Sequence, residues 1–248
     1  MYDYYLGGSH NLEVDRRMAR EAISMWADLP TIMQSNRAFL RRAVRYVVSQ
    51  GITQFLDIGS GIPTVGNVHE VAQQADSQAR VVYVDNDPVA VSHSRAILAQ
   101  TERTAVVHAD LREPDSILEH PLVMETLDLD RPVALLMVAV LHFVPDEDDP
   151  SAALALMRDR LAPGSHLVLS HASADGRPEV AGSHRELYRR TATPMTMRTH
   201  GEIAQFFDGF QIVAPGLVWL PLWRPDEVGD AGLPPERTTG FAAVGRKQ

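Results

Sequence analysis

Residues 54–64 read QFLDIGSGIPT, a short apolar strand that runs directly into a tight glycine turn. Gly59 and Gly61 lack the Cβ atoms that would block close approach of the backbone to a ligand. We expect the turn to lead into a helix that begins near Thr64 and directs its free N–H groups at a bound group. This pattern predicts a nucleotide-like ligand at the turn.

The residue order within the turn discriminates between ligands. A dinucleotide fingerprint has a third glycine, which lets helix and strand pack closely, and this chain has Thr64 at that position. Asp57 would bring negative charge close to a pyrophosphate, but it suits a ligand with ammonium and sulfonium centres. The turn therefore favours S-adenosylmethionine over a dinucleotide.

A second buried strand, residues 80–85 (RVVYVD), ends in an acid. Asp85 lies roughly 20 residues beyond the glycine turn, where a carboxylate meets ribose hydroxyls in mononucleotide-binding units. We therefore predict that Asp85 binds the ribose, with Asn86 beside it. Asp87 precedes a proline and is predicted to cap the following helix instead.

A third strand is expected at residues 104–108, and it is followed by Asp110 and Leu111. We predict that Asp110 accepts a hydrogen bond from the adenine amino group and that Leu111 packs on the ring. One acid at a strand tip is often only a solvated residue. Acids at the tips of three successive strands of one sheet indicate a shared ligand site.

The composition excludes several classes of protein. At 248 residues the chain suits one α/β domain with additions, and its formal charge of −9 argues against a nucleic-acid partner. The longest apolar run, residues 133–144, is broken by His142 and is shorter than the roughly 20 residues of a membrane-spanning helix. Without cysteine or an export-type N-terminus, we expect a cytoplasmic protein with no membrane anchor. Homo-oligomer formation is left open.

Strand and helix patterns alternate from about residue 35 onward, which is typical of a mostly parallel sheet with helices on both faces. Strands are expected at 54–58, 80–85, 104–108, 132–139, 165–171, 210–213 and 240–245, and helices at 36–50, 65–75, 89–100, 151–161, 179–190 and 200–207. The last two strands suggest an antiparallel insertion at the sheet edge. We divide the chain into an N-terminal lid and helical extension at 1–50 and one compact domain at 51–248.

Three further features give the chain a resemblance to class I S-adenosylmethionine-dependent methyltransferases. They are the acids after the second and third strands, the loop VLHFVPD at 140–146, and the motif LAPGS at 161–165. The resemblance covers residues 52–171 and implies a Rossmann-like α/β fold with a seven-stranded, mostly parallel sheet, an antiparallel edge strand and extra N-terminal helices. Pro63 replaces a third glycine found in many members, which leaves the local turn shape open.

Nearly the whole chain is also similar to a narrower family of candidate methyltransferases, which is abundant in actinobacteria and has mostly unassigned substrates. The shared motifs are YDYYLGG at 2–8, Asn11, DR at 15–16, NRAFL at 36–40, residues 55–64, GNVHE at 66–70, YVDNDP at 83–88 and WRP at 223–225. This resemblance implies methyl transfer from S-adenosylmethionine. The predicted cofactor-binding residues are Asp57, Gly59, Gly61, Thr64, Asp85, Asn86, Asp110 and Leu111, with Ala139 and Val140 lining the pocket after the fourth strand.

Methyl transfer is an in-line displacement, so the enzyme mainly has to hold the acceptor atom close to the methyl group. A general base is optional, and His142 and His171 are the candidates because both follow strands at their carboxyl ends. A loop histidine more commonly bonds the backbone. The ends of the fourth and fifth strands carry no carboxylate, so we predict a metal-independent reaction.

The N-terminal arm concentrates aromatic residues ahead of the sheet. Tyr2, Tyr4 and Tyr5 precede Gly7 as a hinge, and the arm extends to Asn11. We predict a lid that covers the acceptor and excludes water. The alternative is an aromatic anchor that ties the terminus to the domain.

Two functions from different classes fit these patterns. The first is a methyltransferase acting on the oxygen or nitrogen of a small organic acceptor. The second is a non-catalytic S-adenosylmethionine-binding module with a regulatory or sensor role. Both require cofactor binding, and they differ in turnover.

Overall fold

The computed structural model spans residues 1–248 and describes all of them except 1, 9–10, 12, 64–65, 177–194 and 227–232. Its centre is an eight-stranded sheet. The strands are β1 Gln54–Ile58, β2 Arg80–Asp85, β3 Thr104–His108, β4 Ala134–Val138, β5 His166–Ala172, β6 Phe210–Ile212, β7 Val218–Trp219 and β8 Gly240–Lys247.

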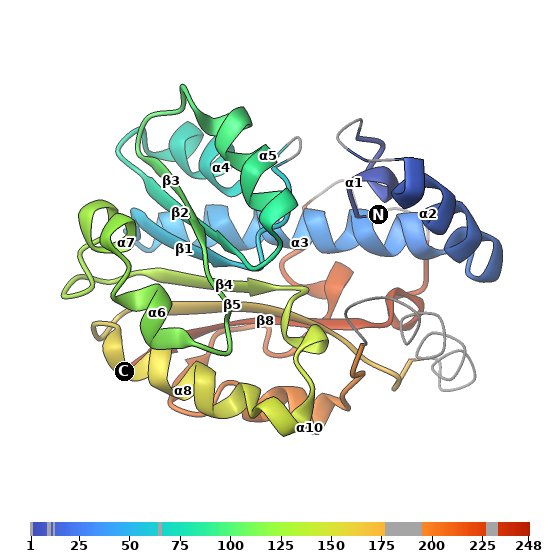
Figure 1. The fold of residues 1–248 in the computed structure, drawn as a ribbon. Helices are drawn as coiled ribbons and strands as arrows, with labels where there is room; N and C mark the ends of the chain where they lie inside the picture. The colour runs from blue at the N-terminus through green and yellow to red at the C-terminus, as the bar shows by residue number, and fades with distance from the viewer. Residues whose placement is uncertain (1, 9–10, 12, 64–65, 177–194, 227–232) are drawn as a thin grey trace.

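Helices cover both faces of this sheet (Figure 1). The helices in the described part of the chain are α1 Tyr2–Tyr5, α2 Glu13–Met25, α3 Leu29–Ser49, α4 Val68–Ala75, α5 Pro88–Leu98, α6 Pro114–Leu118, α7 Pro121–Thr126, α8 Pro150–Arg160 and α10 His200–Gln205. Short 3₁₀ helices are η1 Leu141–Phe143, η2 Asp146–Asp148, η3 Leu220–Leu222 and η4 Pro235–Thr238. One core cluster joins the sheet to α3, α4 and α5, and a second joins it to α6, α7, α8 and α10.

The strand order is β3-β2-β1-β4-β5-β8-β6, and β7 also pairs with β8. β1 to β5 are parallel, whereas β8 runs antiparallel to β5 and β6. The predicted Rossmann-like fold is confirmed. In detail, the antiparallel strand lies one position in from the edge, and β6 is the edge strand. The order reverses between β1 and β4, and ligands bind at such a switch point in α/β sheets.

The predicted helix start near Thr64 is wrong, because α4 begins at Val68. Glu70 Oε2 accepts hydrogen bonds from the N–H groups of Gly66 at 2.7 Å and Asn67 at 3.2 Å, forming a capping box. Glu70 therefore satisfies N–H groups that were expected to face a ligand.

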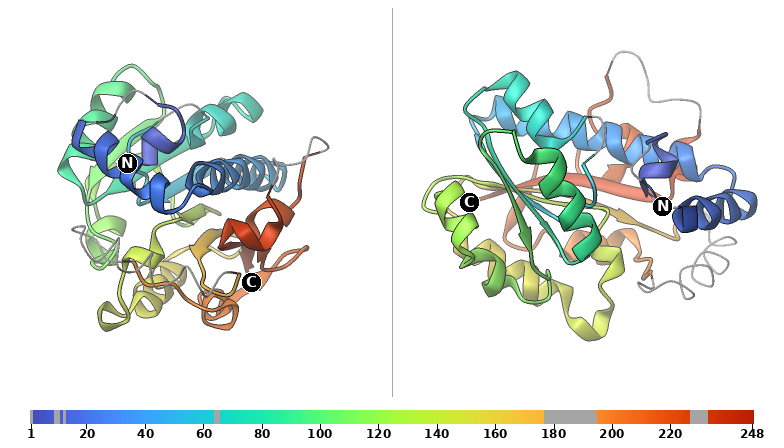
Figure 2. Two further views of the ribbon diagram at one scale, coloured as in Figure 1. Left: turned by 90° about the vertical axis from the view of Figure 1, so that its right-hand side faces the viewer. Right: turned by 45° about the horizontal axis from the view of Figure 1, so that its top comes forward.

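The N-terminal helices form a small core of their own beyond the carboxyl ends of the parallel strands (Figures 1 and 2). Tyr5, Trp26, Leu29 and Ile32 are buried in it. The C-terminal half of α3 packs in the sheet core instead, through residues such as Phe39. α3 therefore connects the N-terminal extension to the sheet, and the division at residue 50 stays a prediction.

The short helices α6 and α7 were not predicted, and each begins with a proline at its first turn, where the missing N–H costs nothing. The helix predicted at 179–190 lies outside the described residues.

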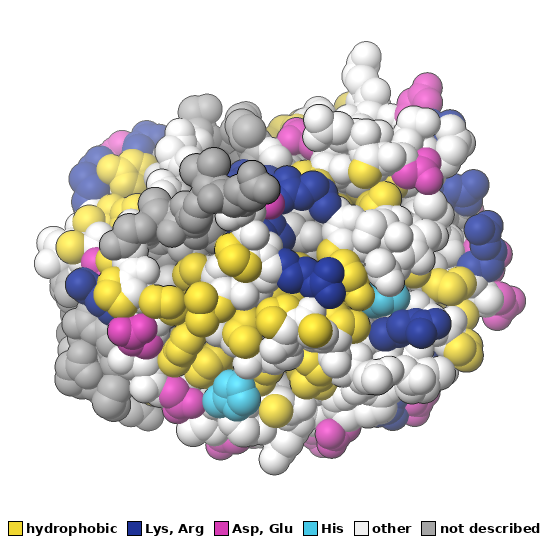
Figure 3. Space-filling model, turned by 180° about the vertical axis from the view of Figure 1, so that it is seen from behind, with side chains coloured by type: hydrophobic (Ala, Val, Ile, Leu, Met, Phe, Trp, Pro, Cys, Tyr) yellow, Lys and Arg dark blue, Asp and Glu magenta, His cyan; other side chains and the backbone are white. Residues whose placement is uncertain are grey.

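No helix in the described part of the chain is long and apolar enough to span a bilayer. Seen from behind, hydrophobic side chains gather centrally among separate basic and acidic ones (Figure 3).

Candidate cofactor-binding site

A cavity of about 370 Å³ lies at the carboxyl ends of the central strands. The ends of β1, β2 and β3 and the β4 loop (residues 139–149) supply its lining, which comprises Ile58, Gly59, Val84, Asp85, Asn86, Ala109, Asp110, Leu111, Arg112, Ala139, Val140, Phe143, Val144, Pro145 and Asp148. Seven predicted cofactor residues are among them. Asp57 and Gly61 are not in the lining, and Thr64 lies outside the described residues.

Gly59 and the β4 loop approach each other closely. A Cβ atom on Gly59, which has φ +70, would lie 2.3 Å from Val140 Cγ2. Ala139 adopts φ 58, a left-handed conformation that is uncommon outside glycine. Its N–H donates to Ser170 Oγ at 3.0 Å, and that hydroxyl donates to Asn36 Oδ1 at 2.6 Å. Support from β5 and α3 thus holds the loop against the glycine turn.

Asp85 holds the glycine turn in place. Its Oδ2 accepts a hydrogen bond from Gly61 N–H at 2.7 Å, and its Oδ1 accepts from Asp87 N–H at 2.9 Å. Burial raises the pKa of Asp85, and these N–H bonds oppose the shift. A carboxylate has about four lone-pair positions, so at least one stays available for a ribose hydroxyl.

Asp110 is bound by Arg112, which the sequence did not single out. Arg112 donates from Nε to Oδ1 at 3.0 Å and from Nη2 to Oδ2 at 2.6 Å. This bidentate pairing is the main reason why the pKa of Asp110 is lowered to about 2. Asp110 is therefore an ionised acceptor in the cavity wall.

Asp57 lies in the buried region beneath the turn. Burial raises its pKa to about 7, the Arg37 guanidinium opposes the shift, and the carboxylate of Asp85 adds to it. Arg37 comes from α3, and its Nη2 donates to Asn67 Oδ1 at 3.1 Å. A buried acid and a basic residue thus lie next to the point where β1 leads into the turn.

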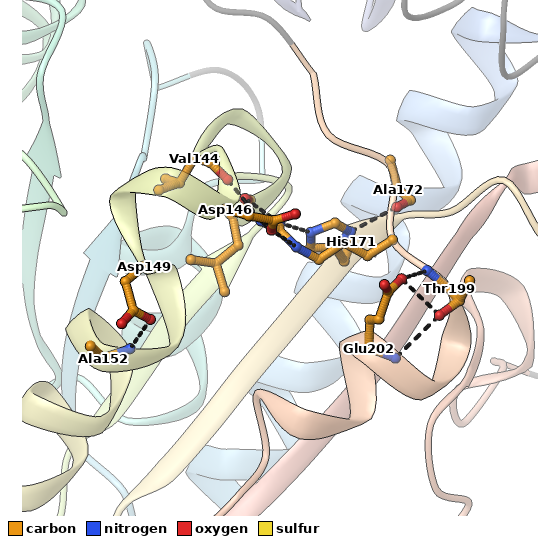
Figure 4. A network of polar contacts seen from close by, with 10 residues as sticks. Val144, Asp146, Asp149, Ala152, His171, Ala172, Thr199 and Glu202 are labelled. Atoms are coloured by element: carbon orange, nitrogen blue, oxygen red, sulfur yellow. Dashed lines mark hydrogen bonds and ion pairs between the residues drawn. The ribbon is translucent and has the colours of Figure 1, made fainter.

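Arg198 anchors the β4 loop from outside the cavity. Its guanidinium donates to Asp146 Oδ1 at 2.6 Å, to the carbonyls of Leu141 and Val144 at 3.0 and 2.9 Å, and to His171 Nε2 at 2.9 Å. In Figure 4, Val144 and Asp146 face His171 at the end of β5. The arginine is only 5% exposed, and it ties the loop to β5.

The two candidate bases lie side by side, His142 within the β4 loop and His171 in β5, with ring centroids 5.4 Å apart, and neither lines the cavity. Because Arg198 only donates, His171 accepts at Nε2 and carries its proton on Nδ1, which donates to Ala172 O at 2.7 Å. Burial lowers its pKa to about 3, and the nearby Arg198 charge adds to this. His171 has no lone pair available to a substrate in this arrangement.

His142 has a different hydrogen-bond partner. Its Nδ1 accepts from the N–H of Ala172 at 3.3 Å, so the neutral ring carries its proton on Nε2. Nδ1 is therefore engaged by the backbone.

The N-terminal arm does not present its described aromatic side chains to the cavity. Tyr5 is 4% exposed within the helical core, and the side chain of Tyr2 lies outside the described residues. Gly7 adopts φ +78 with open space around it. Asn11 donates to the Gly8 carbonyl at 2.8 Å. The described part of the arm fits an anchor, and its closure as a lid stays a prediction.

The sequence patterns did not predict roles for three arginines of these networks. Arg37 belongs to the shared NRAFL motif, which was a usable signal. Arg112 follows a strand-tip acid by two residues, and nothing in the pattern shows that it folds back onto that acid. Arg198 lies 27 residues after His171, so only the fold brings them together.

Comparisons with known proteins agree with this geometry. No curated protein matches the chain. A DUF574 family protein from Streptomyces avermitilis MA-4680 is 42% identical, with a TM-score of 0.95 and coverage of 100% of this chain and 95% of that one. A candidate methyltransferase from Thermobifida fusca YX is also 42% identical, with a TM-score of 0.93 and coverage of 100% and 93%. The N-methyltransferase NodS from Bradyrhizobium japonicum WM9, solved with S-adenosylhomocysteine, shares the fold at 14% identity, a TM-score of 0.52 and 87% coverage of each chain.

The fold and cavity define a class I S-adenosylmethionine-dependent methyltransferase. The chain belongs to the S-adenosyl methyltransferase family, whose model matches residues 1–248. Its cofactor is S-adenosylmethionine.

Replacement of Asp85 with alanine is expected to weaken binding of S-adenosylhomocysteine at least about tenfold, because charge-assisted hydrogen bonds contribute roughly 1.5–3 kcal/mol each. Calorimetry measures the Kd. Asp87→Ala is the matched control, since Asp87 follows the same strand and caps α5 by accepting from Val89 N–H at 2.8 Å. The control should lose about 1 kcal/mol of stability and keep its affinity. An unchanged Kd for Asp85→Ala would place the ribose elsewhere.

Proposed function

We propose that the protein transfers a methyl group from S-adenosylmethionine to the oxygen or nitrogen of a small organic acceptor, without a metal ion, in the cytoplasm. The observation that carries this proposal is the cavity at the β1/β4 switch point, where seven predicted cofactor residues line one space. The formal charge of −9 makes a polyanionic acceptor unfavourable.

The amino-acid end of the cofactor is a zwitterion, and Asp57 and Arg37 suit its two charges. In this proposal the Asp57 carboxylate binds the ammonium group beneath the glycine turn. Arg37 approaches from α3 on the Asn67 side and suits the cofactor carboxylate. In this assignment the N-terminal extension contributes directly to cofactor binding.

The catalytic proposal follows from the in-line chemistry. A sulfonium methyl group needs no Lewis acid, so positioning is the main task of the protein. Among the described residues, no three His, Asp or Glu side chains are grouped so that they could hold a metal. His142 is the retained catalytic candidate, and His171 is assigned to positioning the β4 loop through Arg198.

The test supplies the protein with metabolite extracts and S-adenosylmethionine carrying a deuterated methyl group. We expect mass spectrometry to find a small product bearing the labelled methyl group on oxygen or nitrogen, formed equally well with and without EDTA. Asp85→Ala serves as the control and should form little product.

Two results would count against the proposal. If the cofactor binds but no extract yields labelled product, a sensor or regulatory module becomes the better interpretation. If EDTA abolishes transfer, the metal-independent mechanism is wrong.

A further inference from the structure

Arg112 joins two walls of the cavity. Its Nη1 donates to Asp148 Oδ2 at 3.3 Å, while its Nε and Nη2 hold Asp110 at 3.0 and 2.6 Å. Asp110 follows β3, Asp148 belongs to η2 in the β4 loop, and all three side chains line the cavity. One guanidinium group therefore connects loops that follow two different strands.

The Asp110 carboxylate has no spare acceptor position in this arrangement. Its Oδ1 accepts from the backbone N–H and Nε of Arg112 at 2.9 and 3.0 Å. Its Oδ2 accepts from Arg112 Nη2 at 2.6 Å and Asn86 Nδ2 at 3.2 Å. Since a carboxylate offers about four lone-pair positions, a further donor can bind only by replacing one of these.

Solvent reaches all three groups, so their hydrogen-bond partners can exchange. The Arg112 side chain is 51% exposed, and those of Asp110 and Asp148 are 24% and 33% exposed. Solvent screening weakens ion pairs with this degree of exposure, although the bidentate contact makes the pair with Asp110 stronger than the single contact with Asp148. Asp148 already accepts from Nη1 of the same guanidinium at 3.3 Å, so the guanidinium keeps one carboxylate when its contact with the other is replaced. These contacts fit an ion pair that changes partners when a ligand binds better than a permanent link between the two loops.

We propose that Arg112 is a specificity residue that latches the β4 loop over the adenine of the cofactor. The amino group of the bound adenine takes the position on Asp110 that Arg112 Nη2 holds, and the released guanidinium pairs with Asp148. A purine with oxygen in place of that amino group offers Asp110 no donor, so the guanidinium stays shared between Asp110 and Asp148. The inference rests on the assignment of Asp110 to the adenine amino group within the proposed function.

The test compares the release of S-adenosylhomocysteine with that of S-inosylhomocysteine, in which oxygen replaces the amino group. Surface plasmon resonance on the immobilised full-length protein measures both dissociation rates. We expect Arg112→Met to speed release of the adenine ligand about tenfold and to leave the inosine ligand within about twofold. Asp148→Asn should have the same effect, and the double variant should show no further change because both substitutions break one pair.

Arg160→Met is the matched control. Arg160 is 46% exposed and lies 3.7 Å from Asp115 and 3.5 Å from Glu119, outside the cavity lining. It should change neither release rate. The latch is excluded if Arg112→Met speeds the release of both ligands equally, or of neither, while the wild type still prefers the adenine ligand. Failure of the wild type to bind either ligand would overturn the adenosine site together with the latch.

Discussion

The Asp57→Asn variant is expected to be more stable than the wild type at pH 8, by up to about 4 kcal/mol, and equally stable near pH 4. Burial raises the pKa of Asp57 from 3.8 to about 7. Between about pH 4 and pH 7 the folded chain keeps a proton that the unfolded chain has released, so this group lowers stability as the pH rises through that window. Urea unfolding at the two pH values measures the difference.

The same substitution should weaken S-adenosylmethionine binding roughly 10- to 100-fold, because the ammonium group loses its carboxylate partner. At pH 6 the wild type should release about one proton on binding, since the cationic ligand favours ionised Asp57. Calorimetry in two buffers of different ionisation enthalpy counts that proton, and Asp57→Asn should release none.

The exposed Asp130 supplies the control for Asp57. Asp130→Asn should change neither the pH dependence of stability nor the affinity. A wild type whose stability relative to Asp57→Asn is the same at pH 4 and pH 8 would show that folding leaves the pKa of Asp57 unchanged.

The Gly59→Ala variant is expected to lose about 3–5 kcal/mol of stability and its ability to bind the cofactor. The added Cβ would lie 2.3 Å from Val140 Cγ2 and 2.7 Å from Val140 Cβ, in a residue with φ +70. The backbone strain and the overlap act together, and relief of the overlap would push the β4 loop out of the cavity wall. Thermal unfolding and calorimetry provide the two measurements.

Gly61→Ala is the matched control in the same turn. Gly61 has φ +62, and nothing lies within 4 Å of the position that an added Cβ would take. It should lose only the strain of a left-handed alanine, about 1–2 kcal/mol. Equal losses for the two variants would mean that strain, rather than contact with Val140, makes Gly59 necessary.

Local sequence patterns were sufficient for most of the fold. Apolar runs bounded by turn residues predicted β2 and β3 with the observed limits, because buried parallel strands are continuous hydrophobic segments. The capping box at Thr199 predicted α10, because capping depends on residues three apart. The equivalent pair at Asn67 and Glu70 was overlooked, and so α4 was begun too early.

In the candidate site, too, local patterns predicted some features and only the tertiary structure determined others. The positions of Gly59, Asp85 and Asp110 follow from strand ends, since the carboxyl ends of parallel strands meet at one edge of a sheet. The tautomer of His171 could not be predicted, because it depends on Arg198, which approaches from a distant part of the chain.

The amino-acid sequence alone was enough to specify the class of fold, the cofactor and the edge of the sheet where the cofactor is expected, because each depends on short-range patterns of hydrophobicity, turns and acids. Tertiary structure alone decided which charges meet there. Arg37, Arg112 and Arg198 each pair with groups on other loops or elements, and burial shifts the pKa of Asp57 and His171 in opposite directions. Desolvation and ion pairing depend on distances in space, and spacing along the chain does not encode those distances.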